Sequence, residues 1–187
     1  YNKVQSYLRA QVEEFHRANP LAPGPSKETL RASTGLPSRL FDQILSETPD
    51  LKDAKGAISS SKHQVVLTDD EERQVAEIQG LMMQKPYEPL TLGALNERGF
   101  SSELLYAGSH LGCLVPLSNE HWTTPDVVNG ILDILFSEEA FQNGFELSTF
   151  RDRFDTSRKF ALAFLEYFDA QGITKRKGDA RTLGKRP

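Results

Sequence analysis

Apolar residues recur at intervals of three and four along several stretches of the chain, which is the pattern of an amphipathic helix. The clearest stretch covers residues 155–172, where Ala161, Phe164, Leu165 and Phe168 form one apolar stripe. Gly172 follows the stripe, and glycine commonly ends a helix because it tolerates a positive φ. The pattern predicts a helix that opens at about Ser157, buries this stripe and ends at Gly172.

A basic hairpin is predicted directly after this helix. Residues 173–177 and 180–183 read as two strands around Gly178-Asp179, a pair suited to a type II′ turn. In that register Arg176 lies opposite Arg181. Because like charges directly across a ladder destabilise a hairpin, the pair suggests a polyanionic partner. A solvated basic tail is the simpler alternative.

The same order of elements is predicted three times along the chain. Each round has a helix, a shorter helix, a turn, a third helix and a hairpin. The first round covers helices at 4–19, 26–35 and 37–47 and a hairpin at 57–67; the second covers helices at 69–85, near 95 and at 101–110 and a hairpin-like segment at 114–124; the third covers helices at 124–141, 146–154 and 155–172 and the basic hairpin.

Apolar positions recur with these elements at a period of about 55–65 residues. The corresponding triplets are Leu30, Leu36 and Leu40, then Leu95, Phe100 and Leu104, then Phe150, Phe154 and Phe160. A helix-turn-helix followed by a β-wing is the winged-helix arrangement. We therefore expect a mostly α fold with small β-wings, divided into winged-helix domains at 1–67, 68–123 and 124–187.

Charge is distributed unevenly over this repeat. The net charge of −4 hides nine Lys/Arg against seven Asp/Glu in residues 1–67, three against thirteen in 68–144, and ten against six in 145–187. An acidic middle segment is a poor site for nucleic acid, whereas the C-terminal third can attract it.

No catalytic or metal-binding pattern is found in the sequence. It has no phosphate-binding loop and no GxGxxG after a strand, its four histidines lack partners at ligand spacing, and Ser157 has no histidine nearby. We expect neither an enzyme, nor a metal site, nor a cofactor in this chain. Trp122 and Tyr106 are expected to belong to the packing of the middle domain.

Several further features bear on setting and assembly. No apolar run reaches the length of a membrane span, and the single cysteine, Cys113, fits a reducing cytoplasmic environment. No heptad pattern suggests dimerisation, so a monomer is expected. The opening Tyr1 suggests a fragment or a processed piece of a longer protein.

The third round resembles the closing module of the bacterial selenocysteine-specific elongation factor family, SelB. The resemblance is carried by the strings TSRKFA (156–161), LEYFD (165–169) and GITKR (172–176), and HRANPLAPGPSKETL (16–30) resembles an upstream winged helix of that family. It covers nearly the whole chain and is most specific in the last module.

The resemblance implies a row of winged-helix domains that follows a GTPase portion. In that family the last domain binds the apical loop of the selenocysteine insertion (SECIS) hairpin in mRNA. The GTPase portion, absent from this sequence, binds GTP with magnesium and selenocysteyl-tRNA. The expected partners are therefore the SECIS hairpin and, through the full-length protein, the ribosome and selenocysteyl-tRNA.

The family's RNA-contacting positions fall on residues already marked by charge. The helix start corresponds to Ser157, Arg158 and Lys159, and the basic wing to Lys175, Arg176, Lys177 and Arg181. Two lysines, at 175 and 177, stand where the family often has arginine, and residues 184–187 have no clear counterpart. Because arginine forms bidentate contacts that lysine does not, we expect Arg158, Arg176 and Arg181 to make specific contacts and the lysines to contact phosphate.

Two other functions are compatible with winged helices. A DNA-binding regulator would have a recognition helix that is basic along its length and, in most cases, a two-fold dimer. Here the helix becomes acidic after its first turn, at Glu166 and Asp169. A protein-interaction scaffold would use the acidic middle segment as its contact surface.

Overall fold

The computed structural model describes residues 2–54 and 56–186, which form two compact units, 1–70 and 71–187. Tyr1 and Pro187, the outer limits of the predicted domains, lie outside the described residues. The second unit covers the two domains predicted at 68–123 and 124–187 except for residues 68–70, which belong to the first unit. Nothing else tests the predicted division into three, which stays a prediction.

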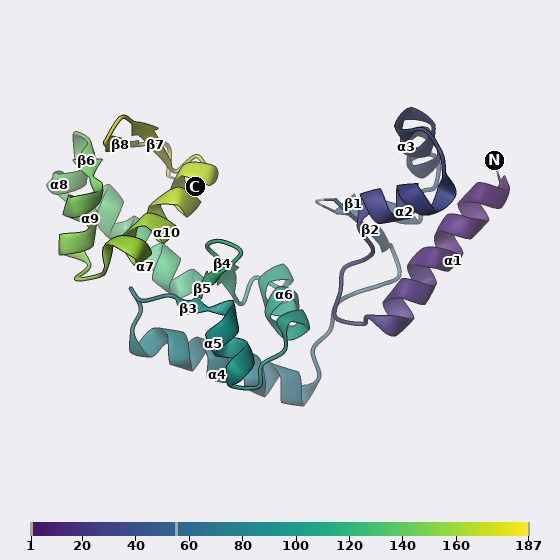
Figure 1. Cartoon of the computed structure of the whole chain (residues 1–187), viewed down its shortest axis with the longest axis horizontal. Coiled ribbons are helices and arrows are strands. Elements are labelled where there is room, and N and C mark those ends of the chain that lie inside the picture. Colours follow the sequence, from purple (N-terminus) through teal and green to yellow (C-terminus); the bar gives the residue numbers. More distant parts are fainter. Residues whose placement is uncertain (1, 55, 187) are drawn as a thin grey trace. The chain divides into compact units, whose positions relative to one another are not determined.

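The first unit is a helical domain with a two-stranded wing (Figure 1). It contains α1 (Asn2–Ala18), α2 (Lys27–Thr34), α3 (Ser38–Ser46), β1 (Leu51–Ala54) and β2 (Ala57–Ser60). The strands are antiparallel, and an isolated bridge joins Ser26 to Ala57. Its core consists of Leu8, Val12, Leu30, Phe41, Ile44, Leu45, Leu51 and Ile58.

The second unit repeats this order of elements twice. Its first half contains α4 (Asp69–Gln84), β3 (Leu90–Thr91), α5 (Leu92–Glu97), α6 (Ser102–His110), β4 (Val115–Pro116) and β5 (His121–Thr123). Its second half contains α7 (Pro125–Ser137), α8 (Glu139–Gln142), β6 (Phe145–Glu146), α9 (Leu147–Arg153), α10 (Arg158–Ala170), β7 (Thr174–Lys177) and β8 (Ala180–Leu183). The two antiparallel sheets have the orders β3-β5-β4 and β6-β8-β7. The mostly α, tandem winged-helix fold is confirmed.

Helices α2, α5, α6, α7 and α10 each begin at a side-chain cap. Ser26, Thr91, Ser101, Thr124 and Ser157 each accept a hydrogen bond from the backbone N–H three residues later. Such caps satisfy N–H groups that have no partner inside the helix, and each contributes about 1 kcal/mol.

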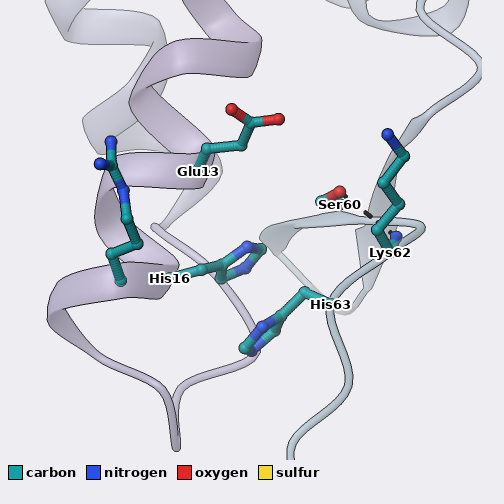
Figure 2. A pocket seen from close by; sticks show the side chains of 6 residues that line it. Glu13, His16, Ser60, Lys62 and His63 are labelled. Carbon is teal, nitrogen blue, oxygen red and sulfur yellow. Dashed lines mark hydrogen bonds between the residues drawn. The ribbon is translucent and has the colours of Figure 1, made fainter.

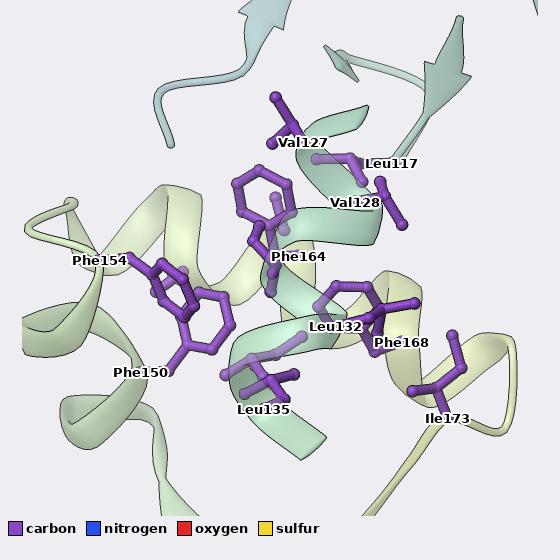
Figure 3. Packing of buried hydrophobic residues seen from close by; sticks show 14 of the residues in the cluster. Leu117, Val127, Val128, Leu132, Leu135, Phe150, Phe154, Phe164, Phe168 and Ile173 are labelled. Atoms are coloured by element: carbon purple, nitrogen blue, oxygen red, sulfur yellow. The ribbon is translucent and has the colours of Figure 1, made fainter. Parts of the chain in front are cut away.

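An aromatic core holds the second half together. Phe150, Phe154, Phe164 and Phe168 are buried against the apolar face of α7 (Figure 3). The rings of Phe150 and Phe154 lie 4.6 Å apart between centroids. The stripe predicted on α10 is therefore the buried face, as Ala161, Phe164, Leu165 and Phe168 are all buried.

Three predicted details are wrong. The first hairpin lies at 51–60 rather than 57–67, because Gly56 turns the chain with a positive φ of 88° and its N–H donates to the Asp53 carboxylate. The helix predicted over 124–141 is broken at Glu138, which is extended and accepts from Arg153 Nε. Leu40 is 37% exposed, because Phe41 and not Leu40 faces the first core.

The middle wing packs against the start of α10. The buried His121 ring meets the Phe160 ring edge-on, with centroids 5.9 Å apart, and Leu117 belongs to the aromatic core of the second half. The hydroxyl of Thr156 donates to the Tyr87 carbonyl at 2.5 Å. The two halves of this unit thus share one core.

We expect this packing to weaken in mild acid. Burial lowers the pKa of the His121 imidazole below its ordinary value of 6.5, partly opposed by Glu120 and reinforced by Lys159. The folded state then binds fewer protons than the unfolded state. The stabilisation is complete above about pH 6.5 and declines as the pH falls below that value.

Denaturant unfolding at pH 7.5 and pH 5.5, followed by the fluorescence of Trp122, measures this effect. His121→Phe keeps a buried aromatic ring and removes the ionisable imidazole. The variant should therefore lose less stability between pH 7.5 and pH 5.5 than the parent chain. An equal loss in both proteins would contradict the role of His121.

Candidate nucleic-acid interface

The first turn of α10 presents an exposed cationic surface. Ser157, Arg158 and Lys159 are all exposed, and the Ser157 hydroxyl oxygen accepts from the Phe160 N–H at 3.2 Å. The helix N-terminus has positive dipole character, which makes an exposed cation there unfavourable by about 0.3–1 kcal/mol. An anion bound at this end would relieve that cost and would accept from the N–H groups of the first turn.

The wing has the predicted register. Arg176 pairs with Arg181, Thr174 with Leu183, and Gly178-Asp179 forms the turn. Gly178 has a φ of 63° and Asp179 has no positive φ, which matches the predicted type II′ turn. Because side chains alternate along a strand, Arg176 and Arg181 share one face of the wing and Lys175 and Lys177 lie on the other.

Arg181 is buried, whereas the predicted contact with RNA would require an exposed side chain. Its side chain is 3% exposed, and its Nε donates to the Asp169 carboxylate at 2.9 Å. The other oxygen of Asp169 accepts from the Thr174 hydroxyl at 2.5 Å. Asp169 therefore joins the end of α10 to both strands of the wing.

The Asp169 carboxylate compensates the charge of Arg181 inside the protein. The Arg176–Arg181 pair therefore needs no external polyanion, and the inference of a polyanionic partner from the repulsion between these two arginines is wrong. The Nη2 atom of Arg181 is buried without a hydrogen-bond partner in the described part of the chain. Arg181 thus positions the wing, while Arg176 at its tip stays exposed and donates from Nε to the Gly178 carbonyl at 2.9 Å.

A groove of about 430 Å³ lies between the helix start and the wing. Arg158 and Arg176 both line it, together with the buried Arg181. Its full lining is Glu146, Leu147, Ser148, Arg158, Leu162, Glu166, Arg176, Asp179 and Arg181. Guanidinium groups supply donors and the carboxylates supply acceptors, so the groove can pair with the polar edge of a nucleotide base as well as with phosphate.

Sequence reasoning missed one wall of this groove. Glu146, Leu147 and Ser148 come from β6 and the start of α9, and Asp179 comes from the wing turn. Two-residue strands are too short for alternation to reveal. In the preceding repeat β3 occupies the place of β6, and in the first repeat the Ser26–Ala57 bridge does so. An alignment of the three repeats could therefore have indicated the strand β6.

The cationic residues outside the groove have different surroundings. Lys175 and Lys177 are exposed on the opposite face of the wing. The amine of Lys159 lies 3.4 Å from the Glu120 carboxylate of the middle wing, and both side chains are exposed. Exposed pairs of this kind contribute about 0–1 kcal/mol, so a phosphate can displace Glu120.

No metal-binding arrangement is found in residues 2–54 and 56–186, where no three His, Cys, Asp or Glu side chains cluster. No helix in the described part of the chain is long and apolar enough to cross a membrane.

We expect Asp169→Asn to destabilise the protein by about 2–4 kcal/mol, because it leaves the buried Arg181 cation without its carboxylate. Denaturant unfolding measures the change. Glu166→Gln, on the exposed side of the same helix, is the matched control and should change stability by less than about 0.5 kcal/mol. Asp169→Asn combined with Arg181→Met should recover part of the loss; equal losses in the single and double variants would contradict the charge explanation.

Comparisons with known proteins agree with the fold and the sequence resemblance. Residues 9–48 and 139–183 each match a family model described as "Elongation factor SelB, winged helix". A curated selenocysteine-specific elongation factor from Desulfomicrobium baculatum is 29% identical over 191 residues. That alignment covers 92% of this chain but 29% of the relative, so the chain spans less than a third of its length.

Two solved structures share the fold. The mRNA-binding domain of SelB from E. coli, in complex with SECIS RNA, has a TM-score of 0.53 at 20% identity and covers 64% of this chain and 100% of its own. A bacterial selenocysteine-specific elongation factor, EF-Sec, has a TM-score of 0.55 at 16% identity, over 98% of this chain and 30% of its own. The resemblance predicted from the sequence is confirmed: residues 9–48 and 139–183 match winged-helix models of the elongation factor SelB, and 92% of the chain is similar to part of a selenocysteine-specific elongation factor.

Proposed function

We propose that this chain is the C-terminal, mRNA-binding part of a selenocysteine-specific translation elongation factor and that it binds the loop of a SECIS hairpin in the groove between α10 and the wing. The observation that carries the proposal is the convergence of Arg158 and Arg176 on that groove, in the segment that matches the SelB winged helix. The SECIS RNA bound by the structurally similar E. coli domain supports the choice of ligand.

The proposed binding mode follows from the geometry of RNA. Side chains do not enter the deep, narrow major groove of an A-form helix, so specific readers bind loops and splayed bases. The first turn of α10 would bind a loop phosphate through its N–H groups and the Ser157 hydroxyl. Arg158 and Arg176 would contact base edges or paired phosphate oxygens from the two sides, and Lys159, Lys175 and Lys177 would contact phosphates. Arg181 would act indirectly, by orienting the wing.

The rest of the proposed function concerns a longer protein. A GTPase portion, outside this sequence, would bind GTP with magnesium and selenocysteyl-tRNA and would deliver the tRNA to UGA codons on the ribosome. The present chain would contribute no catalytic residue and would act as a monomer in the cytoplasm, where translation occurs. The first two predicted domains would act as a spacer between the RNA-binding domain and the GTPase portion.

A DNA-binding role is less well supported by the same helix. Glu166 is exposed on the groove side of α10, so the helix is not basic along its length as a major-groove recognition helix would be. A gel shift with a hairpin RNA, a matched duplex DNA and an RNA without the loop separates the two functions. Binding to duplex DNA in preference to the hairpin would replace the proposal.

Arg158→Ala should weaken hairpin binding by about 10–100-fold, because a bidentate arginine contact contributes about 1–3 kcal/mol. Arg176→Ala should have an effect of the same order. Lys52→Ala, an exposed lysine on β1 of the first unit, is the matched control. Fluorescence anisotropy with a labelled hairpin measures all four proteins, and undiminished binding by both arginine variants would exclude this groove.

The dependence of binding on salt should be shallow. The proposed footprint involves only a few phosphates, and each contributes about 0.7–0.9 to the slope of log K against log salt concentration. Anisotropy titrations between 50 and 300 mM KCl should therefore give a slope of about −2 to −4. A slope near −10 would indicate an extended duplex-binding surface instead.

A further inference from the structure

A second polar pocket lies in the first unit, outside every residue predicted to contact RNA. Its volume is about 460 Å³, and it lies between the end of α1 and the segment that follows β2 (Figure 2). Its lining residues are Glu13, His16, Arg17, Ser60, Lys62 and His63. Two of them, His16 and His63, come from distant parts of the sequence and meet face to face.

The two imidazole rings are stacked, with centroids 3.7 Å apart and planes inclined by 11°. His16 Nε2 lies 3.1 Å from the Pro23 carbonyl, and His63 Nε2 lies 3.0 Å from the Ala22 carbonyl. A carbonyl oxygen only accepts, so each Nε2 must carry a proton and donate. Each Nδ1 is then the nitrogen that can gain a proton, and neither has a hydrogen-bond partner in the described part of the chain.

Protonation of both rings would place two cations in contact, which is unfavourable unless an anion compensates for them. Burial already lowers the pKa of His16 below its ordinary 6.5, with His63 as a smaller cause in the same direction and the Pro23 carbonyl opposing it. A neighbouring anion would reverse this trend. Proton uptake by His16 is therefore coupled to the arrival of negative charge in the pocket.

The remaining side chains of the pocket favour an anion over a metal cation. Lys62 is exposed and forms no ion pair with any described residue, and Arg17 contributes a second cation that shares a surface pair with Glu14 at 2.6 Å. Glu13 is the single carboxylate of the lining. The Ser60 oxygen accepts from the Lys62 backbone N–H at 3.3 Å, which leaves its O–H free to donate to a ligand.

We propose that this pocket is a phosphate-binding site, in which Lys62 and Arg17 supply charge, Ser60 supplies a hydroxyl donor and the buried His16, stacked on His63, supplies an Nδ1–H donor on protonation. The ligand is a phosphate group, from a free phosphate or from the backbone of an RNA strand. Binding takes up protons, so it strengthens as the pH falls from 7.5 to 6.0. The site is independent of the α10 groove, because it lies in the other unit.

The test follows the imidazole resonances of the full chain by NMR during titration with inorganic phosphate at pH 6.5, against sodium chloride of equal ionic strength. His16 and His63 should shift saturably, while His110 in the second unit should not. Sulfate, whose charge is constant over this range, gives the pH dependence and should bind at least threefold more tightly at pH 6.0 than at pH 7.5.

Three variants sharpen the test. Lys62→Gln should weaken phosphate binding at least fivefold, Glu13→Gln should strengthen it at least twofold, and Lys52→Gln, outside the pocket, should leave it unchanged. Absence of a saturable shift beyond the chloride control, or equal affinity in the Lys62→Gln variant, would overturn the proposal.

A six-nucleotide single-stranded RNA distinguishes the two sources of phosphate. Saturation by the oligonucleotide at a lower concentration than by inorganic phosphate identifies an RNA backbone, and a response to inorganic phosphate alone identifies a free phosphate. Arg158→Ala should weaken hairpin binding by about 10–100-fold and keep the phosphate response of His16 and His63. Failure of the hairpin proposal would therefore leave this one standing, and the reverse also holds.

Discussion

The candidate interface depends on the two hydrogen bonds that the Asp169 carboxylate accepts. One of its oxygens accepts from the Arg181 guanidinium and the other from the Thr174 hydroxyl, so a single side chain at the end of α10 sets the position of both wing strands. The distance between the helix start and the wing tip follows from this link. Neither Arg158 nor Arg176 is held by an ion pair of its own in the described part of the chain. Their separation is therefore set by the backbone of the helix and the wing. The two side chains could contact the same nucleotide loop only if that separation is maintained.

The same link explains how two cations can lie opposite each other in the wing of the free protein. Two arginines stand directly opposite each other on adjacent strands. One is buried with a carboxylate, and the other extends toward solvent beyond the turn. The buried ion pair and the exposed Arg176 cation together give a surface that can attract a polyanion without strong repulsion in the free protein.

Much of this architecture could be predicted from the sequence, because burial is periodic. The stripe on α10, the helix starts near Ser101 and Ser157, and the register that pairs Arg176 with Arg181 all follow from local spacing and turn chemistry. The burial of Arg181 could not be predicted in this way. A count of charges does not show which cation has an internal partner, and Asp169 reaches Arg181 only after the wing has folded back over the helix. The wall formed by Glu146 and Ser148 depends on the two-residue strand β6. A strand this short has no recognisable alternation of apolar and polar residues in the sequence.

The shared core of the second unit also limits how such proteins can be rearranged in evolution. Leu117 of the middle wing packs with the aromatic core of the last repeat, and Thr156 is anchored to the Tyr87 carbonyl. A gene fusion that joined foreign sequence at residue 124 would strip apolar neighbours from that core and remove the acceptor of Thr156. A junction near residue 70 leaves both intact. We therefore expect the last two repeats to be inherited together as one block, and shuffling to occur upstream of α4.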